Sequence, residues 1–421
     1  MKRKILAHLL ALALCFSFAA QSLALNSRVP AAPLEGAESF TFLYFGDIQV
    51  VENAAADFAA WGALAKSAVK ANPGVAFALQ GGDIVESGID RAQWDAFLAN
   101  ADAALGDIPF FPTNGNHESN FLSGKPELYL EMFDLPQNGP EGFKGEFYSF
   151  DYGDTHVLIL NSWVFSGEQR LTEDDLAALD VWVADDLKSS DAAWKIAVTH
   201  VPLYPVHSDT TGEKARAHWA PLFEQYGVSL ALVGHQHVYS RLKPLTDSAV
   251  DYENGVTYIM GNAGRKFYDA ADESLAERTV YNTPTYQLVR VDGNSLTVQT
   301  FDGDGNELDY IALSPRAWIA ADDTLTRGEF VAEYLDTATL LGYGDGNLGL
   351  GDAITNEQIA TLLWRAAGEP APQNVPVSGA SDWARDAWAW AVERGIFSDA
   401  QPQTFSTRAD AARALRDYAN S

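Results

Sequence analysis

The chain has 421 residues, which is enough for two or three domains that each bury a core. Apolar residues make up 47% of it and aromatic residues 12%, which excludes a disordered chain and favours globular domains. Its 57 acidic residues outnumber its 28 Lys and Arg, so the net charge is −29. A field of this sign repels polyanions and argues against binding to nucleic acid polymers or anionic membranes.

Residues 1–24 have the pattern of a signal peptide, with basic residues at positions 2–4, an apolar run and a small-residue end. We place cleavage after Ala24; a membrane anchor is the alternative, but the apolar run is short for one. The mature chain would lose Cys15, the only cysteine, and carry 25 basic against 57 acidic residues, a net charge of −32. Such a chain is expected to be secreted and bacterial, without disulfides. Residues 25–37 are predicted to be a linker.

Strands and helices alternate over the first half of the chain, as hydrophobic periodicity predicts. In chain order we expect a strand at Phe40–Phe45, helix 53–71, strand Val75–Leu79, helix 90–104, apolar segment Pro109–Pro112, a hairpin of Tyr148–Tyr152 and His156–Leu160, helix Leu171–Leu187 capped by Thr172, strand Lys195–Val198, helix 212–225 and strand Val228–Val233. The later elements are strands, at Val256–Met260, Tyr286–Val291, Ser295–Phe301 and Leu308–Leu313. This order predicts an α/β (α+β) domain.

Five short polar motifs follow apolar runs, in a fixed order. They contain Asp47 and Gln49 (FGDIQ), Asp83 (GGD), Asn116 and His117 (GNHE), His200 (AVTH), and His235 and His237 (GHQH). Taken singly, a GGD is typical of a turn and a lone histidine of a core. Together they supply carboxylates, an amide oxygen and imidazoles at the ends of predicted strands, where open α/β sheets place their sites. This is the ligand set for two neighbouring metal ions.

Two cations about 3.5–4 Å apart clamp a phosphate and activate a water for its hydrolysis. Asp83 follows two glycines, which let the backbone turn sharply and bring its carboxylate close to both metals. His235 and His237 are two residues apart and are therefore able to address different metals. Asn116 offers a carbonyl oxygen, and its neighbour His117 is free to meet the substrate. The motifs thus predict a two-metal phosphoester hydrolase.

The motif set resembles the calcineurin-like metallophosphoesterases. Within that superfamily, YSFDYGDTHVLILNS, WKIAVTHVPLY and GEKARAHWAPLFEQYGVSLALVGHQHVYSR are similar to the purple acid phosphatase branch. The resemblance covers residues 38–313 and implies a two-sheet β-sandwich flanked by helices. It also implies two metal ions, divalent or trivalent, chosen from Fe, Mn and Zn.

Carried over by position, the resemblance implies a role for each motif residue. Asp47, Gln49 and His237 would form the first metal site, Asp83 would bridge, and Asn116, His200 and His235 would complete the second. His117 would bind the phosphate and protonate the leaving group. His207 and Arg216 resemble substrate-binding residues of the branch. The alternative for His207 is a solvated loop histidine. For Arg216, and for Arg241, which also matches a basic position of the branch, the alternative is a structural salt bridge.

Two positions depart from the family pattern. Gln49 stands where most members have the histidine of Asp-x-His, and an amide oxygen is a weaker, harder ligand than imidazole. Glu86 stands where the purple enzymes have a tyrosine, so we expect no charge-transfer colour. Glu86 either ligates a metal or faces solvent.

The composition changes at Ser314-Pro315, and residues 314–421 are predicted to form a small all-α domain. Its three segments resemble S-layer homology repeats, which bind cell-wall polysaccharide. The Thr-Arg pair of such repeats occurs at Thr326-Arg327 and Thr407-Arg408, but Thr355-Asn356 lacks the basic residue. We expect the cluster of Trp383, Trp388 and Trp390 to form a helix core.

These features favour an exported, wall-associated enzyme that hydrolyses small phosphate monoesters by attack of a metal-bound hydroxide, with His117 as general acid. One alternative is a phosphodiesterase or nucleotide hydrolase of the same fold. Another is an inactive cell-wall-binding scaffold, in which Gln49 and Glu86 mark lost activity.

Overall fold

The computed structural model describes residues 39–49, 53–120, 122–169, 171–207, 210–252, 254–315, 353–372 and 376–406, with residues 327, 330, 411, 414, 415 and 418. The predicted leader and linker lie outside these residues, as do Thr326 and the Thr407-Arg408 pair. The chain divides into two compact units, Met1–Ala317 and Trp318–Ser421. Within the described ranges, no helix combines the length and apolar character needed to cross a membrane.

The first sheet of the larger unit has six strands in the order β15-β14-β13-β1-β2-β3. Their bounds are β1 (Ser39–Phe45), β2 (Ala78–Gln80), β3 (Phe110–Pro112), β13 (Thr285–Asp292), β14 (Ser295–Asp302) and β15 (Glu307–Leu313). Strands β1, β2 and β3 are parallel to one another, and β13 joins β1 in antiparallel register. The carboxyl ends of β1, β2 and β3 therefore share one edge of the sheet.

The second sheet has seven strands in the order β12-β8-β11-β7-β6-β5-β4. Their bounds are β4 (Tyr148–Tyr152), β5 (Thr155–Leu160), β6 (Trp194–Thr199), β7 (Val228–Val233), β8 (Tyr239–Leu242), β11 (Thr257–Met260) and β12 (Ala276–Val280). Strands β5, β6, β7 and β11 are parallel, so their carboxyl ends also share one edge. A separate ribbon pairs β9 (Leu245–Thr246) with β10 (Ala249–Val250).

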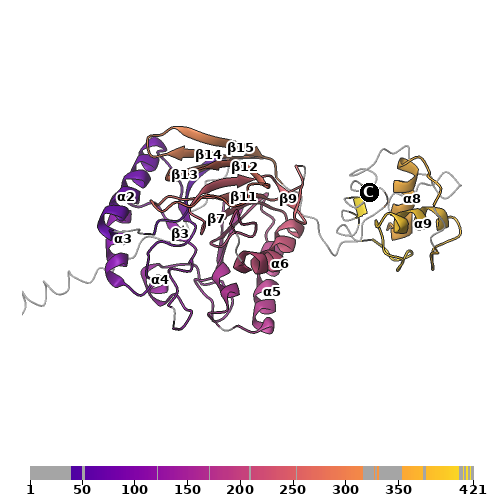
Figure 1. The fold of residues 1–421 in the computed structure, drawn as a ribbon, viewed down its shortest axis with the longest axis horizontal. Helices are drawn as coiled ribbons and strands as arrows, with labels where there is room; N and C mark the ends of the chain where they lie inside the picture. The colour runs from indigo at the N-terminus through magenta and orange to yellow at the C-terminus, as the bar shows by residue number, and fades with distance from the viewer. Residues whose placement is uncertain are drawn as a thin grey trace, which may run out of the picture. The chain divides into compact units, whose positions relative to one another are not determined.

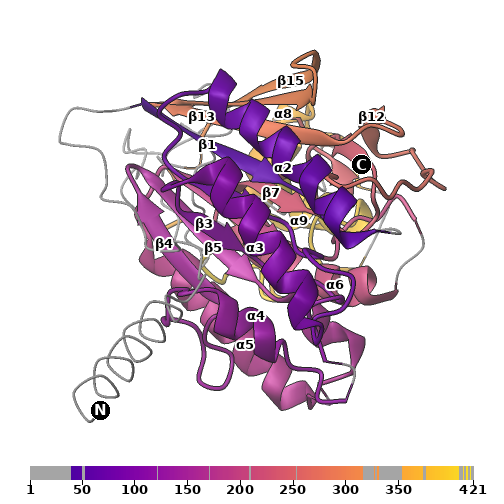
Figure 2. The same ribbon diagram turned by 90° about the vertical axis from the view of Figure 1, so that its left-hand side faces the viewer.

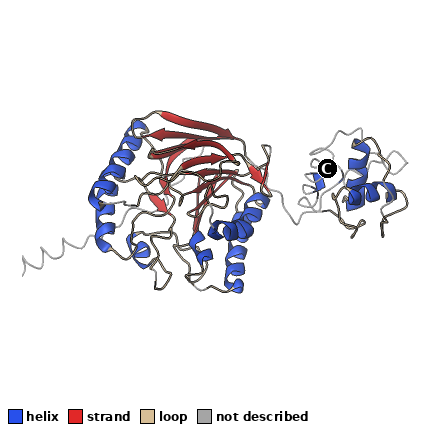
Figure 3. Ribbon diagram, in the orientation of Figure 1, coloured by secondary structure: helices blue, strands red, loops and turns tan. Residues whose placement is uncertain are grey.

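Helices cover the outer faces of the two sheets. Figures 1 and 2 show α2 (Ala54–Ala71) and α3 (Arg91–Leu105) on the first sheet, and α5 (Glu173–Ser189) and α6 (Thr210–Gln225) on the second. Phe45 of β1 packs on Trp61 of α2 at 5.9 Å between ring centroids. The remaining helices of this unit are α4 (Glu127–Met132) and the short 3₁₀ helix η1 (Ser162–Ser166). The order helix, sheet, sheet, helix is clear when helices and strands are coloured separately (Figure 3), and it confirms the predicted α/β two-sheet sandwich.

Aromatic side chains fill the space between the sheets. The ring centroid of Phe150 from β4 lies 4.3 Å from that of Phe111 and 5.4 Å from that of Phe77. Phe111 belongs to β3 and Phe77 directly precedes β2, both strands of the first sheet. The Tyr44 hydroxyl donates a hydrogen bond of 2.7 Å to the carbonyl of Val233 in the second sheet. A buried layer of this kind fixes the strand ends relative to one another.

A salt bridge also joins the sheets. Arg241 of β8 donates from Nε and from a terminal nitrogen to the Asp309 carboxylate of β15, at 2.7 and 3.0 Å. Arg241 thus forms a structural salt bridge, the alternative role considered for it from the sequence.

Most predicted elements of this unit are present within a few residues. The Gly153-Asp154 turn joins antiparallel β4 and β5, and Thr172 caps α5 through a capping box with Asp175. The predicted strand Val75–Leu79 was wrong at its start, because regular pairing begins only at Ala78. Helix α4, η1 and strands β8 and β12 were not predicted, since each is short and lacks a clear period.

His156 of β5 lies between two carboxylates, with Nδ1 2.7 Å from Asp151 and Nε2 2.9 Å from Asp186. Burial acts to lower its pKa, but the hydrogen bonds and charges of Asp186 and Asp151 raise it. A raised pKa in the folded state stabilises the protein fully below the unfolded value of about 6.5, and the contribution is lost as pH rises through the folded value.

We therefore predict that His156→Gln lowers the free energy of unfolding by about 1–3 kcal/mol at pH 6. The deficit should shrink as the pH is raised above neutrality. Denaturant unfolding of both proteins at several pH values, under one metal condition, measures it. A deficit that grows with pH would contradict this prediction.

In the smaller unit, α8 (Asn356–Ala366) packs on α9 (Arg385–Glu393) around a core that includes Ile359, Leu363 and Trp388. Trp388 and Trp390 are buried, whereas Trp383 is 59% exposed. The core role expected for this cluster therefore applies to the first two residues, and Trp383 lies at the surface.

Candidate metal centre

The five motifs meet where the carboxyl ends of the two sheets come together. Asp47, Asp83 and Asn116 follow β1, β2 and β3 of the first sheet, and His200 and His235 follow β6 and β7 of the second. Backbone hydrogen bonds connect them: the amide of His235 donates to Asp47 Oδ1 at 2.9 Å, and the amide of Gly234 donates to the His200 carbonyl at 2.9 Å. Topology thus assembles one site from segments almost 200 residues apart.

Two groups of ligand atoms share Asp83. The first ligand group is Asp47, Asp83 and His237; the second ligand group is Asp83, His200 and His235. Within each group all the ligand atoms lie within 4.8 Å of one another. A carboxylate common to two adjacent groups is in the position of a bridging ligand.

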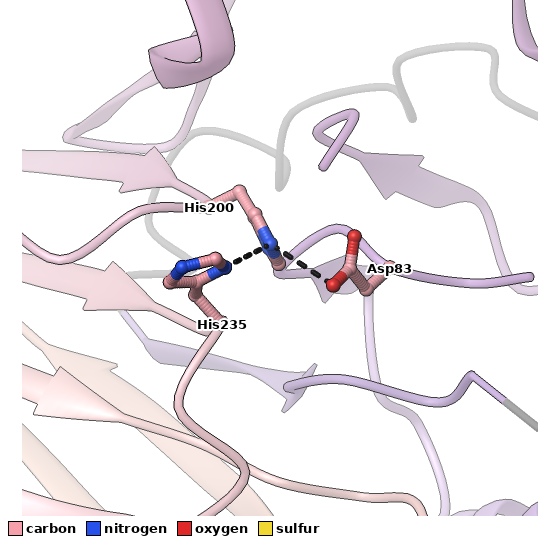
Figure 4. Close-up of side chains that lie close together, drawn as sticks. All are labelled: Asp83, His200 and His235. Carbon is pink, nitrogen blue, oxygen red and sulfur yellow. Dashed lines mark hydrogen bonds and ion pairs between the residues drawn. The ribbon is translucent and has the colours of Figure 1, made fainter. Parts of the chain in front are cut away.

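The second ligand group converges closely (Figure 4). His200 Nε2 lies 3.2 Å from Asp83 Oδ2 and 3.1 Å from His235 Nδ1. Asn116 Oδ1 lies 3.1 Å from both imidazole nitrogens. His200 Nδ1 donates to the Gly81 carbonyl at 2.8 Å, which leaves Nε2 as the ligating nitrogen. The Asn116 oxygen therefore lies beside the second ligand group.

The first ligand group contains buried polar atoms that no described residue satisfies. Asp47 Oδ2 and His237 Nδ1 are 3.2 Å apart, and neither has a hydrogen-bond partner in the described part of the chain. Gln49 Oε1 is also buried without one. Such atoms cost about 1–3 kcal/mol each when left unpaired, so a cation between them fits the donors present.

The ligands are held in strained backbone conformations. Asp83, His235 and His237 have φ of 53°, 74° and 48°, in the left-handed region that costs a non-glycine residue about 1–3 kcal/mol. At the neighbouring Gly115 and Gly234, a Cβ would overlap the carboxylates of Asp83 and Asp47. Glycine is therefore required where the motif backbone passes against a ligand.

Burial and charge divide the protons of the site unevenly. Burial raises the pKa of Asp47 to about 7 and lowers that of His237 to about 3. Burial acts in the same way on Asp83, but the charge and hydrogen bond of His200 hold its pKa well below the usual range. Burial opposes protonation of His200, yet the charges of Asp83 and Asp47 raise its pKa to about 10. Because a metal needs a neutral imidazole, metal binding would compete with protonation of His200.

Glu118 completes the GNHE motif, and its role was not anticipated. Its Oε2 accepts from the amides of Asp83 and Gly115, at 2.8 and 2.7 Å, and its Oε1 accepts from those of Ile84 and Val85, at 2.8 and 3.2 Å. This buried carboxylate therefore ties the GGD loop to the GNHE loop and positions Asp83.

We predict that Glu118→Gln lowers the free energy of unfolding by about 1–3 kcal/mol and metal affinity by about 10–100-fold. The amide nitrogen of Gln would face backbone N–H donors that need an acceptor. Denaturant unfolding and metal titration measure the two effects. Glu127→Gln, at an exposed position of α4 where the carboxylate accepts from Ser123, is the control. Equal metal affinity in the two variants would contradict the prediction.

A pocket of about 380 Å³ opens over the site. It is lined by Asp83, Asn116, His117, His207, His235, Gln236, His237, Lys266 and Tyr268. His117 Nδ1 donates to the Glu86 carbonyl at 2.7 Å, and its amide donates to Asp83 Oδ1 at 3.0 Å. These bonds fix the ring and place its Nε2 3.0 Å from the Gln49 amide nitrogen, at the edge of the pocket.

Glu86 does not simply face solvent. Its side chain is 45% exposed, but its Oε2 accepts a hydrogen bond of 2.7 Å from Gln49 Nε2. The bond holds the Gln49 amide with its nitrogen toward Glu86. The two departures from the family pattern are therefore in contact with each other.

His207 and Arg216 have different surroundings. His207 lines the pocket, as expected of a substrate-binding residue. The Arg216 guanidinium instead lies over the Tyr204 ring, 5.4 Å from its centroid, and Arg216 is not among the pocket-lining residues that the structure describes. No described carboxylate forms an ion pair with Arg216, so neither of the roles considered for it is seen.

Lys266 and Tyr268 line the pocket without having been predicted. Both belong to the segment that follows β11, and β11 is parallel to β7, so its carboxyl end lies at the same edge as the GHQH motif. The rule that located the other motifs, polar residues after a strand, would also have indicated GRKFY.

Residues 40–239 match the family model described as calcineurin-like phosphoesterase. An uncharacterized protein of Mycobacterium tuberculosis is 29% identical over 191 residues, which are 40% of this chain and 35% of that protein. Purple acid phosphatase 23 of Arabidopsis thaliana is 27% identical over 181 residues, 41% of this chain and 38% of its own. The chain thus spans well under half the length of these relatives.

The solved structure of the purple acid phosphatase PPD1 from yellow lupin (Lupinus luteus) seeds superposes on the chain with a TM-score of 0.56 at 19% identity. The match covers 68% of this chain and 56% of the lupin chain. This likeness concerns the fold. The sequence matches support the expected resemblance to metallophosphoesterases and to purple acid phosphatases.

Proposed function

We propose, from the calcineurin-like phosphoesterase domain at residues 40–239, that the chain is a two-metal hydrolase of small phosphate monoesters. One observation carries the proposal: Asp83 is shared by two converging ligand groups at the base of a pocket that His117 also lines. Paired metal sites with a common carboxylate suit phosphoester hydrolysis, in which a negative nucleophile must reach the phosphorus of a negatively charged phosphate group.

The donors fit two metal ions of different character. Asp47, Gln49, Asp83 and His237 would hold the first with three oxygens and one nitrogen; Asp83, Asn116, His200 and His235 would hold the second with two of each. The oxygen-rich group suits the harder ion of the pair, chosen among Fe, Mn and Zn. When bound, the ions supply Lewis acidity and an activated water. Glu86 holds the Gln49 amide in place, and since it replaces a tyrosine, the loaded protein should lack the purple colour.

The chain's own side chains bind the phosphate and handle the leaving group. His117 lines the pocket, so in its charged form its Nε2 would donate a hydrogen bond to a phosphate oxygen and a proton to the leaving oxygen, in place of its contact with Gln49. Because Nδ1 donates to the Glu86 carbonyl, Nε2 carries a proton only when the ring is charged. Burial acts to lower the pKa of His117, but the charge of Asp83 and the bond to Glu86 raise it, which favours the charged ring. His207, which follows β6 of the second sheet, would contact the ester from the side of the pocket opposite His117. Arg216 takes no part in the proposed site.

The remaining parts of the proposal concern location. Residues 1–24 would act as a signal peptide, 25–37 as a linker and 38–313 as the catalytic domain. Residues 314–421 would form a small all-α domain of S-layer homology type and hold the protein at a bacterial cell wall. The packed core of α8, α9 and Trp388 supports a folded domain there. Pull-down of the purified protein with isolated wall polysaccharide tests this attachment.

The test of function is hydrolysis of p-nitrophenyl phosphate and bis-p-nitrophenyl phosphate after loading with Mn, Zn or Fe. Turnover of the monoester would support the proposal if a chelator abolishes this activity and added metal restores it. Turnover of the diester alone would favour a phosphodiesterase of the same fold. No turnover with any metal, together with no bound metal by elemental analysis, would refute an enzyme and leave the wall-binding scaffold.

A further inference from the structure

Building on the proposed phosphoesterase function, we infer that the pocket selects phosphate monoesters whose leaving group carries a second anionic group, held by Lys266 and His207. The residues that line the pocket differ in origin and in charge. Asp83, Asn116 and His117 follow strands of the first sheet and belong to the metal and phosphate site. Lys266, Tyr268 and His207 follow strands of the second sheet and belong to neither ligand group, although the Tyr268 ring lies 4.8 Å from that of His237.

Lys266 brings a positive charge to a strongly acidic protein. It is the one Lys or Arg among the described residues that line the pocket, and no described carboxylate lies within ion-pair distance of it. Its neighbour Arg265 is used differently, because its guanidinium pairs with Asp57 of α2 at 3.2 Å. Asn262 Nδ2 donates to the Lys266 carbonyl at 2.8 Å and fixes the backbone there. Lys266 is therefore held at the pocket with its charge available.

His207 presents an unsatisfied nitrogen at the same pocket as Lys266. Gln236 accepts from the His207 amide at 3.0 Å and donates to its carbonyl at 3.2 Å, so the residue is held on both sides. Its Nε2 is buried and has no hydrogen-bond partner in the described part of the chain. Tyr268 lies between the two groups: its ring centroid is 6.1 Å from that of His207 and 5.5 Å from Lys266 Nζ.

A second anionic group would satisfy both residues at once. A neutral leaving group would leave the His207 nitrogen unpaired, which is costly for a buried polar atom. The chain's net charge of −29 repels anions, so a dianionic ester needs a local cation to be captured. A pocket of about 380 Å³ lies near the lower end for small-molecule sites. The substrate class is therefore small phosphoesters that carry a carboxylate or a second phosphate.

The test compares leaving groups of equal size. We would measure kcat/KM of the metal-loaded protein on 4-carboxyphenyl phosphate and on its neutral match, 4-carbamoylphenyl phosphate, with 1,4-phenylene bisphosphate as the arm for a second phosphate. The charged esters should be preferred by about tenfold, through KM. The larger of the two preferences identifies carboxylate or phosphate as the second group.

Lys266→Gln should bring the ratio between charged and neutral esters close to one. Lys214→Gln, at an exposed position of α6, removes the same charge and should keep the ratio. A wild-type ratio near one, or an unchanged ratio in Lys266→Gln, would overturn the inference. If no ester is hydrolysed, the proposed function fails separately, and calorimetric binding of 4-carboxybenzylphosphonate against its carbamoyl analogue still decides the anion preference.

Discussion

Replacing Asp83 with Asn should abolish most phosphoester hydrolysis and lower the metal content of the protein. Asp83 is the one residue common to both ligand groups, and its Oδ1 accepts a hydrogen bond from the His117 amide. Asparagine keeps the shape but loses the charge and one oxygen acceptor. Loss of an outer partner of a metal ligand typically costs about 10–100-fold in affinity or activity, so loss of the shared ligand should cost more than about a hundredfold.

Elemental analysis and kcat/KM on p-nitrophenyl phosphate measure this effect in parallel. Asp309→Asn is a matched control, because the Asp309 side chain is only 10% exposed but pairs with Arg241 between the sheets. That variant should lose stability while keeping its metals and its turnover. An Asp83→Asn protein that binds two metals per chain and turns over like the wild type would contradict the bridging role.

The convergence of the candidate ligand residues was predictable because their signals are local. Asp47, Asp83, His200 and His235 each follow an apolar run directly, and strands that end at one edge bring such residues together. Their left-handed conformations were not predictable, since only the neighbouring glycines hint at them. Glu118 was quoted within GNHE but given no role, because a carboxylate that binds four amides is recognised only once the loops are folded.

Residues outside the motifs were harder to assign. Lys266 and Tyr268 reach the pocket because β11 pairs with β7, a long-range choice that one sequence does not reveal. Arg216 shows the opposite failure: its position along the chain resembled a substrate-binding residue, but its side chain packs on Tyr204. Spacing along a helix predicts on which face a residue lies, but not what that face contacts.

Replacing His117 should slow hydrolysis without removing the metals, which separates its role from that of Asp83. General acid catalysis contributes about 10²–10⁴-fold, and the size of the contribution depends on how much the leaving oxygen needs a proton. Nitrophenolate leaves readily as an anion, whereas phenolate is more basic. His117→Asn should therefore lose much more rate on phenyl phosphate than on p-nitrophenyl phosphate, with two metals per chain in both proteins.

The contrast between the two esters also separates protonation from binding. If His117 only held the phosphate, His117→Asn would lower kcat/KM equally for both substrates, because their phosphate groups are identical. His218→Asn is the control, since His218 pairs with Asp180 between α5 and α6 and does not line the pocket. Unequal losses in His117→Asn, with neither loss in His218→Asn, would identify the ring that Glu86 orients as the proton donor, and equal losses would reject that role.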